Sequence, residues 1–168
     1  DPRAYAMVGF GGAGPAHAAE VARVLGVQEV LIPPASGAAS ALGFLAAPLS
    51  FEQVRSHPVR LSAPDAASVI DGALTALEAE ARAQLRAAGV ADADIVTERS
   101  ADMRLEGQMH EINVKLPDGA IDADGLATIR TRFAEAYAAR YTSVYGGVGI
   151  QAISFRVRCR GPLPGLSL

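Results

Sequence analysis

The sequence predicts an α+β protein with two parts, and three observations support this class. In residues 1–48, short apolar runs alternate with segments of helical periodicity, and glycine or proline separates them. In residues 49–168, runs that alternate between apolar and polar side chains flank two long amphipathic stretches. Half of the residues are apolar, which is typical of a globular protein. We therefore expect one domain over residues 1–48 and a second over 49–168.

The bulk composition excludes several classes of partner. The formal net charge is −3 with both signs interspersed, which argues against a nucleic-acid-binding surface. The single cysteine excludes an internal disulfide, no cluster of Cys and His predicts a metal site, and no signal peptide is visible. The most apolar run, residues 35–49, is shorter than the ~20 residues of a membrane span. We expect a cytoplasmic location and neither a nucleic-acid nor a membrane partner.

A glycine-rich turn follows the first predicted element. Residues 4–8 predict a buried strand and residues 16–25 a helix that ends at Gly26. Between them lie Gly11, Gly12, Ala13 and Gly14, where free N–H groups at the positive end of a helix form a cradle for an anion such as phosphate. The alternative is a tight strand-to-helix turn that binds no ligand.

The residues around this turn bear on whether its glycines belong to a dinucleotide-binding motif. The spacing fits the G-x-G-x-x-G pattern of dinucleotide-binding folds, which also require an acid at the end of the second strand. Here the second strand, residues 28–32, runs into Pro33 and Pro34, and its acid Glu29 lies at the wrong end. His17, in the first helical turn, either contacts a ligand or is a polar group bonded to backbone or water.

Residues 33–89 predict a helix, an extended segment and a longer helix. Ser36 or Ser40 is expected to cap the first of these helices. Residues 49–61 are extended, and Pro58 marks an edge strand or the start of a strand. Residues 62–65 resemble a capping box for a helix that stops near Gly89. The apolar stripe of this helix contains Ile70, Leu74, Leu77, Ala81, Leu85 and Ala88.

Residues 95–106 and 108–116 predict two strands joined at Gly107, each with one apolar and one polar face. On the polar side, Arg104, Gln108 and Glu111 form either a wall that faces a substrate or another subunit, or a cross-strand ion pair that Asp102 can join. His110 has the parity of the apolar residues, which predicts a core or edge group.

The last elements are a helix and a strand. Asp122 is expected to cap the helix, and Gly146, Gly147 and Gly149 predict a turn before the strand at residues 150–160. The predicted helix stripe is Leu126, Ile129, Phe133, Ala136, Tyr137 and Tyr141. In the strand, the apolar side is Ile153, Phe155, Val157 and the buried thiol Cys159, opposite Ser154, Arg156, Arg158 and Arg160. The arginine row is either solvated or meets an acidic partner.

The order of elements from residue 49 is strand, helix, strand, strand, helix, strand, which is the ferredoxin-like split βαβ pattern. That pattern makes the first strand central, where Pro58 is unfavourable because proline cannot donate a ladder hydrogen bond. The conflict disappears if this strand begins only at Val59.

Two long motifs carry a resemblance to a known family. Residues 9–43, from the glycine turn through VLIPPASGAASALG, and residues 102–111, DMRLEGQMHE, are similar to the C-terminal region of the hydantoinase A/oxoprolinase family. Leu105 departs from the family pattern, which has an aromatic residue there. The resemblance implies that residues 1–48 are a βαβα remnant of an ATPase sheet similar to those of actin and sugar kinases.

The resemblance also implies an activity, the ATP-dependent ring opening of a cyclic amide such as a hydantoin or oxoproline. Mg²⁺ would accompany ATP, with its ligands and the main phosphate loops upstream of this chain, and no catalytic residue is assigned. The alternatives are a subunit of an acetone- or acetophenone-type carboxylase, or a non-catalytic assembly module. Expected partners are the upstream part of the polypeptide and either a homo-oligomer or a second hydantoinase-type subunit. The piece alone is expected to be inactive.

Overall fold

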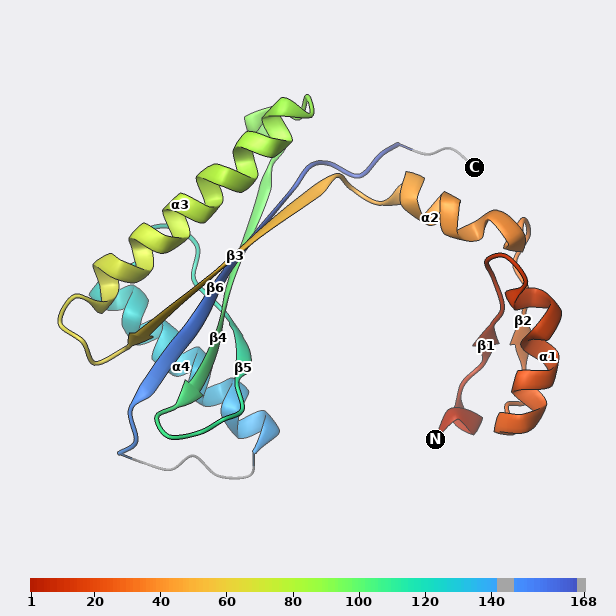
Figure 1. Ribbon diagram of the computed structural model, residues 1–168, viewed down its shortest axis with the longest axis horizontal. Coiled ribbons are helices and arrows are strands. Elements are labelled where there is room, and N and C mark those ends of the chain that lie inside the picture. The colour runs from red at the N-terminus through yellow and green to blue at the C-terminus, as the bar shows by residue number, and fades with distance from the viewer. Residues whose placement is uncertain (142–146, 166–168) are drawn as a thin grey trace. The chain divides into compact units, whose positions relative to one another are not determined.

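The computed structural model describes residues 1–141 and 147–165. The chain forms two compact units, one of Asp1–Pro48 with the chain end from Leu163, and one of Leu49–Pro162 (Figure 1). The structure is thus a mixture of helix and sheet, as the sequence predicts at the level of fold class.

The first unit is a small βαβα arrangement. Strands β1 (Met7–Val8) and β2 (Val30–Leu31) pair in parallel and are connected by α1 (Gly14–Leu25). The 3₁₀ helix η1 (Pro2–Ala4) precedes β1, and η2 (Ser36–Ala38) with α2 (Ala39–Ala46) follows β2. Both strands are shorter than the predicted apolar runs. Helix α1 begins two residues before the predicted start, because glycine and proline fit the first turn, where N–H groups have no partner within the helix.

The ends of these helices test the predicted caps. Gly26 ends α1 in the left-handed conformation, as predicted, with φ 72°. The prediction that Ser36 or Ser40 caps the second helix is wrong. The N-cap of α2 is Ala38, which has no side-chain capping bond, and the 3₁₀ turn η2 leads the chain into the helix instead.

The first unit buries little apolar surface of its own. Its buried hydrophobic residues are Ala18 and Ala22, both on α1. The larger apolar residues of α1 form a face that is exposed, and Val24 is 72% accessible. In α2, Phe44 is 84% accessible. Two short strands and two short helices are therefore not enough to cover their own apolar faces.

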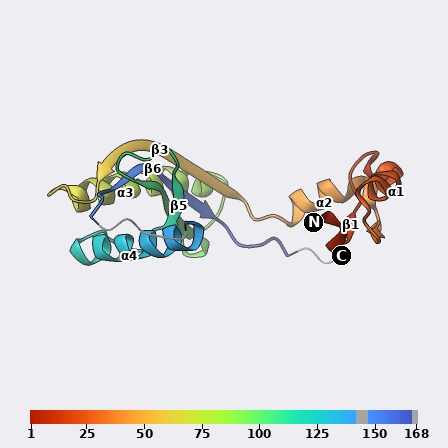
Figure 2. The same ribbon diagram turned by 90° about the horizontal axis from the view of Figure 1, so that it is seen from below.

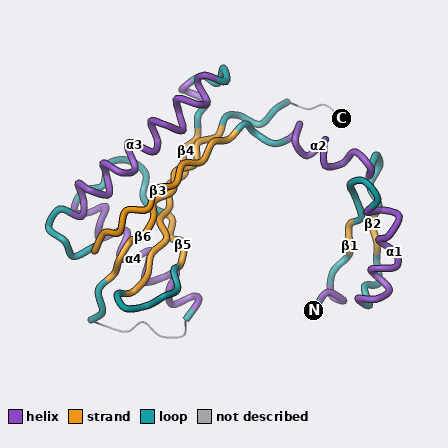
Figure 3. Tube along the Cα trace, in the orientation of Figure 1, coloured by secondary structure: helices purple, strands orange, loops and turns teal. Residues whose placement is uncertain are grey.

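The second unit is a four-stranded sheet with two long helices. Its elements are β3 (Ser50–Arg60), α3 (Ala66–Ala87), η3 (Asp92–Asp94), β4 (Val96–Leu105), β5 (Ile112–Lys115), α4 (Ala123–Arg140) and β6 (Ile150–Arg160). The strand order is β3-β6-β4-β5, and each neighbouring pair is antiparallel (Figure 3). Helix α3 thus connects two parallel strands, β3 and β4, with the antiparallel strand β6 between them, which is a split βαβ connection.

The strand order contradicts the ferredoxin-like expectation. That arrangement places the first strand inside the sheet, whereas β3 lies at the edge, beside β6 alone. The edge position resolves the conflict at Pro58, and the β3–β6 register shifts between Ser56 and Val59. The suggestion that the strand begins only at Val59 is wrong, because β3 runs through Pro58 from Ser50.

The core of the second unit lies between the sheet and its helices. Helix α3 packs against β3 and β6, α4 packs against β5, and the two helices also contact each other (Figures 1 and 2). The predicted stripes of both helices are confirmed as buried or partly buried, apart from Ala88, which caps the C-terminus of α3. The largest fully buried side chains include Phe133, Phe155, Leu61, Ile70, Leu74 and Leu77. The opposite face of the sheet carries the polar residues.

Local details of the second unit confirm one predicted cap and correct two predictions. Asp122 caps α4 and accepts a hydrogen bond from the Gly125 N–H at 2.9 Å. The predicted capping box at 62–65 is wrong, because α3 begins at Ala66 after a turn and its N-cap makes no side-chain bond. Ile153 was expected on the apolar side of β6, but it lies at a register shift between β4 and β6. Gly146 lies outside the described residues.

Candidate functional site

The glycine loop, residues 9–14, follows the carboxyl end of β1. The Gly9 N–H donates to the Leu31 carbonyl at 2.9 Å, which continues the parallel pairing into the loop. Gly11 and Gly12 then take positive φ values of 77° and 46°, a conformation that favours glycine. The carboxyl ends of parallel strands are where α/β sheets bind ligands. The loop therefore has the position expected of a ligand site.

The backbone donors of the loop are largely used within the unit. The Gly11 N–H donates to the Ser36 carbonyl at 2.7 Å and the Gly12 N–H to the Gly37 carbonyl at 3.3 Å. The Gly14 N–H donates to the Gly11 carbonyl at 2.9 Å. The expectation that these N–H groups are free is wrong, because the segment after β2 supplies carbonyl partners that the sequence pattern does not reveal. These three donors are not free to grip a phosphate in this conformation.

What the loop offers is space for a close approach. A Cβ atom added at Gly12 or Gly14 would meet no atom within 4 Å. Gly9 has a different role, because a Cβ there would lie 2.8 Å from the Ala18 Cβ and push α1 away from the strand. Ala13 is the N-cap of α1, and His17 is exposed on its first turns. Gly12 and Gly14 therefore leave the backbone bare, and the exposed His17 follows on α1.

The second sequence motif, residues 102–111, lies on β4 and the following loop. The Arg104 and Glu111 side chains approach at 3.8 Å, the ion pair that the sequence offered as one alternative. Gln108 Nε2 donates instead to the Tyr137 hydroxyl at 2.7 Å, which ties the loop to α4. His110 is exposed in the loop, so its predicted place in the core or at a strand edge is wrong. Asp102 does not join the Arg104 pair.

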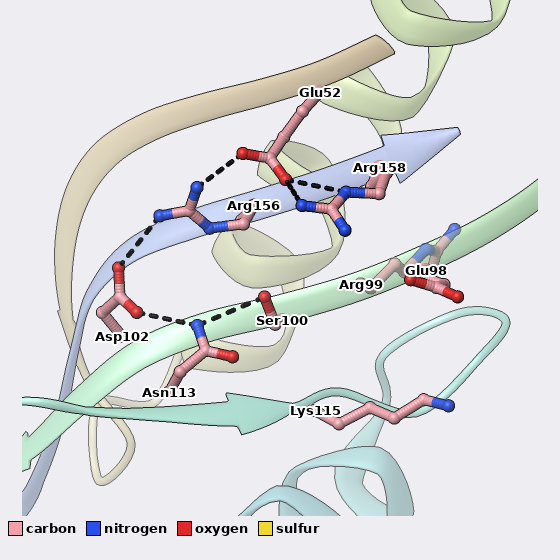
Figure 4. Close-up of a pocket in the computed structure, with 9 residues that line it drawn as sticks. All are labelled: Glu52, Glu98, Arg99, Ser100, Asp102, Asn113, Lys115, Arg156 and Arg158. Atoms are coloured by element: carbon pink, nitrogen blue, oxygen red, sulfur yellow. Dashed lines mark hydrogen bonds and ion pairs between the residues drawn. The ribbon is translucent and has the colours of Figure 1, made fainter. Parts of the chain in front are cut away.

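Asp102 belongs to a polar hollow on the open face of the sheet, which sequence reasoning did not identify as a site (Figure 4). Its volume is about 600 Å³. The lining residues are Glu52, Glu98, Arg99, Ser100, Asp102, Asn113, Lys115, Arg156 and Arg158. The predicted arginine row of the last strand was one signal of this surface, and Glu52, two positions into β3, was another.

A charge network organises the hollow. Arg156 donates to Glu52 at 2.6 Å, and its other nitrogen lies 3.6 Å from Asp102 (Figure 4). Arg158 also donates to Glu52, at 2.7 Å. Asp102 accepts hydrogen bonds from Asn113 and Ser154, both at 2.7 Å. The arginine row therefore meets acids of its own unit.

The network keeps its acids ionised. Partial burial would raise the pKa of Glu52, but hydrogen bonds from Arg156 and Arg158 outweigh it and hold that pKa below its ordinary value. Burial would also raise the pKa of Asp102, but hydrogen bonds from Asn113 and Ser154 hold that pKa below its ordinary value. Neither acid is therefore suited to take up a proton near neutral pH.

A second ion cluster lies on the helix-covered side of the sheet. Glu78 of α3 pairs with Arg99 of β4 at 2.6 Å and with Arg82 at 2.8 Å. Burial raises the pKa of Glu78, but hydrogen bonds from Arg99 and Arg82 lower it further than burial raises it. Cys159 lies nearby as the predicted buried thiol, and burial raises its pKa. This cluster ties a helix to the sheet.

Within residues 1–141 and 147–165, no group of three or more His, Cys, Asp or Glu side chains is arranged to hold a metal ion. In the same residues, no helix has the length and apolar character needed to cross a membrane.

Comparison with known proteins identifies relatives of both parts. Residues 1–53 match the hydantoinase/oxoprolinase family model, and residues 60–159 match the hydantoinase/oxoprolinase C-terminal domain. The chain is 30% identical over 144 residues to the caprolactamase subunit alpha of Pseudomonas jessenii, covering 84% of this chain and 21% of that protein. It is 35% identical over 123 residues to 5-oxoprolinase 1 of Arabidopsis thaliana, covering 73% of this chain and 9% of that protein.

Solved structures show the same fold. The nucleotide-free structure of acetone carboxylase superposes with a TM-score of 0.83 at 21% identity, covering 97% of this chain and 24% of that one. The ATP-dependent caprolactamase from Pseudomonas jessenii gives 0.71 at 26% identity, covering 99% of this chain and 25% of that one. The chain thus spans about a quarter or less of these relatives. With both parts matched by the family's models, the chain belongs to the hydantoinase/oxoprolinase family and includes its C-terminal domain.

Proposed function

We propose that this chain is part of an enzyme that opens a cyclic amide at the expense of ATP. The observation that carries the proposal is the family match over both units, with named relatives that are a caprolactamase and a 5-oxoprolinase. In such chemistry the terminal phosphoryl group of ATP passes to the amide oxygen. Water then adds to the activated carbon and the ring C–N bond breaks, which leaves an acyl phosphate. A second water hydrolyses the acyl phosphate to the carboxylate and free phosphate.

In this proposal the glycine loop is one wall of the nucleotide site. The open space over Gly12 and Gly14 lets a ligand approach the backbone closely, and the exposed His17 follows on α1. Because the N–H groups of Gly11 and Gly12 are engaged, we assign the loop a shaping role and expect the main phosphate donors and the Mg²⁺ ligands upstream. Residues 49–162 would then serve as a structural unit with its own core.

The second candidate is a subunit of an ATP-dependent carboxylase. It is retained because the acetone carboxylase structure superposes over 97% of this chain. At 21% identity, that similarity supports a shared fold only. The two relatives with at least 30% identity and named activities favour amide hydrolysis.

An assay of the full-length protein separates the two. We expect it to release ADP and ring-opened product in equal amounts from 5-oxoproline, hydantoin or caprolactam, without bicarbonate. Turnover of acetone or acetophenone that requires bicarbonate, with no ring opening of the three amides, would replace the proposal by the carboxylase.

The role of the loop is tested by Gly12→Val in the full-length enzyme. A valine side chain fills the space over the loop and is strained at φ 46°, so the KM for ATP should rise at least tenfold. Gly89→Val is the matched control, because Gly89 also has positive φ and open space but ends α3 in the other unit. An unchanged KM for ATP in Gly12→Val would remove the loop from the site.

A further inference from the structure

The glycine loop is held from one side by the segment that follows β2. We define residues 33–38 as the second loop, made of Pro33, Pro34, Ala35 and the turn η2. Its carbonyls at Ser36 and Gly37 accept the N–H groups of Gly11 and Gly12. Since β1 and β2 are parallel neighbours, the two loops leave the same edge of the pair and lie side by side (Figure 1).

The geometry of the second loop depends on an unusual backbone conformation. Ala35 has φ 54° and ψ 32°, and it is the only non-glycine residue with positive φ within residues 1–141 and 147–165. An alanine is disfavoured in this left-handed region, because its Cβ crowds the following carbonyl. The residue therefore adopts a conformation that its own side chain disfavours, immediately before the carbonyls that hold the glycine loop.

The left-handed turn at Ala35 starts the 3₁₀ turn η2 directly after two prolines. The Ala38 N–H donates to the Ala35 carbonyl at 2.8 Å, which closes this turn. The same turn directs the Ser36 carbonyl so that it accepts both the Gly11 N–H and the Ala39 N–H. If Ala35 took an ordinary conformation, the chain direction at residues 36 and 37 would change and the loop would lose these partners.

A second contact fixes the glycine loop from the start of α2. A Cβ atom placed on Gly11 would lie 3.0 Å from the Ser40 Oγ, so the glycine Cα packs closely over this hydroxyl. The loop is therefore held by two hydrogen bonds to carbonyl groups and by a close side-chain contact. A larger residue at 40 would displace Gly11.

We propose that Ala35 is a positioning residue for the nucleotide, which acts by holding the Ser36 and Gly37 carbonyls against the glycine loop. The inference rests on the proposed function, because it assigns the loop to an ATP site. Ala35 itself contacts no substrate in this account. Its effect on the reaction passes through the position of Gly11 and Gly12, and it should appear in the affinity for ATP rather than in that for the amide.

The test compares Ala35→Val and Ala35→Gly in the full-length enzyme. Valine is β-branched and disfavours positive φ, whereas glycine adopts it freely. We expect Ala35→Val to raise the KM for ATP at least tenfold with the KM for the amide within twofold, and Ala35→Gly to stay within threefold for both. Ala91→Val is the control for the substitution itself, since Ala91 is exposed and has φ −70°. It should leave both constants unchanged.

Ser40→Val supplies an independent variant if Ala35→Val fails to fold. It presses on Gly11 from α2 and should raise the KM for ATP with the same selectivity. An ATP KM within twofold of the parent in the folded variants, or an equal rise in both KM values, would overturn the proposal.

A separate readout distinguishes failure of this inference from failure of the proposed function. If the parent protein opens no cyclic amide with ATP, the proposed function is wrong. Hydrogen exchange still reports whether the second loop holds the glycine loop. Ala35→Val should then speed exchange of the Gly11 and Gly12 amides at least tenfold, because they lose their carbonyl partners. Unchanged exchange would show that Ala35 does not hold the loop.

Discussion

In residues 49–162, Phe133 is 1% exposed and Phe155 is fully buried, whereas in residues 1–48 Val24 is 72% and Phe44 is 84% exposed. The two units contain the same kinds of secondary structure, since each combines strands with helices. They differ in whether the apolar faces find partners within the unit. The second unit closes a continuous core between a four-stranded sheet and two helices, while the first unit buries two alanines of α1.

This difference shows how the two regions relate to function. A region with its own core can keep its fold without further segments, and a region with uncovered apolar faces needs them. The glycine loop and the second loop, which carry the proposed nucleotide contact, both lie in the region with little core. We therefore expect the position of the nucleotide wall to depend on segments outside residues 1–48.

The largest expected effect concerns the core of the second unit. Phe133→Ala should lower the free energy of unfolding of residues 49–162 by about 3–5 kcal/mol, because it leaves a cavity under α4. Val24→Ala in α1 should change the free energy of unfolding of the first unit by less than about 0.5 kcal/mol, since that side chain is exposed. Urea denaturation measures both. Equal losses of unfolding free energy in the two variants would contradict the proposed difference between the units.

The next effect concerns ion pairs. Glu78→Gln should cost about 2 kcal/mol of unfolding free energy, because it leaves Arg99, 12% exposed, without its charged partner. Glu20→Gln removes the exposed Arg23 pair of α1, 2.5 Å long, and should have no measurable effect on denaturation. A negligible loss for Glu78→Gln would mean that the cluster joining α3 to β4 does not stabilise the second unit.

Acid should weaken the second unit through the same groups. The folded-state pKa values of Glu52, Glu78 and Asp102 lie below their ordinary values, so these acids add stability above their unfolded pKa of about 4. That contribution to stability is lost as the pH falls from about 4 through the pKa values of the folded state. Thermal unfolding of residues 49–162 measured between pH 6 and 2 should show the fall, and Glu52→Gln should make it shallower. A midpoint independent of pH in this window would contradict the charge network.

The smallest effect is expected at the Arg104–Glu111 pair. Its 3.8 Å separation and partly exposed side chains predict a loss of less than about 1 kcal/mol for Arg104→Ala. Activity of the full-length enzyme should then remain close to that of the parent. A tenfold loss of activity with unchanged stability would instead favour the predicted wall that faces a substrate or another subunit.

Much of the second unit could be predicted from the sequence, because long segments carry a clear period. The stripes of α3 and α4, the Asp122 cap and the alternation at Ala101 and Met103 all agree with the structure. The strand order could not be predicted, because the periodicity of a strand does not name its neighbours. Pro58 was the available signal: an edge strand was one of its two interpretations, and the structure agrees with that one. The irregularity at Ile153 breaks the period of two and was therefore missed.

The candidate site was harder to predict than the fold. The position of the glycine loop after a strand followed from residue types, and the structure agrees. The partners of Gly11 and Gly12 did not, because carbonyl groups at Ser36 and Gly37 have no signature in side-chain chemistry. Left-handed Ala35 is equally hidden, since alanine rarely adopts that conformation. The polar hollow joins residues from all four strands, so its assembly depended on the strand order.

The central claim is that the nucleotide lies against the glycine loop and that residues 49–162 support the fold without binding it. Hydrogen exchange of the full-length enzyme, with and without a non-hydrolysable ATP analogue, tests this most directly. We expect slower exchange with the analogue at residues 9–17 and unchanged exchange along the open face of the four-stranded sheet. Slower exchange around Arg156 and Asn113, with residues 9–17 unaffected, would contradict it.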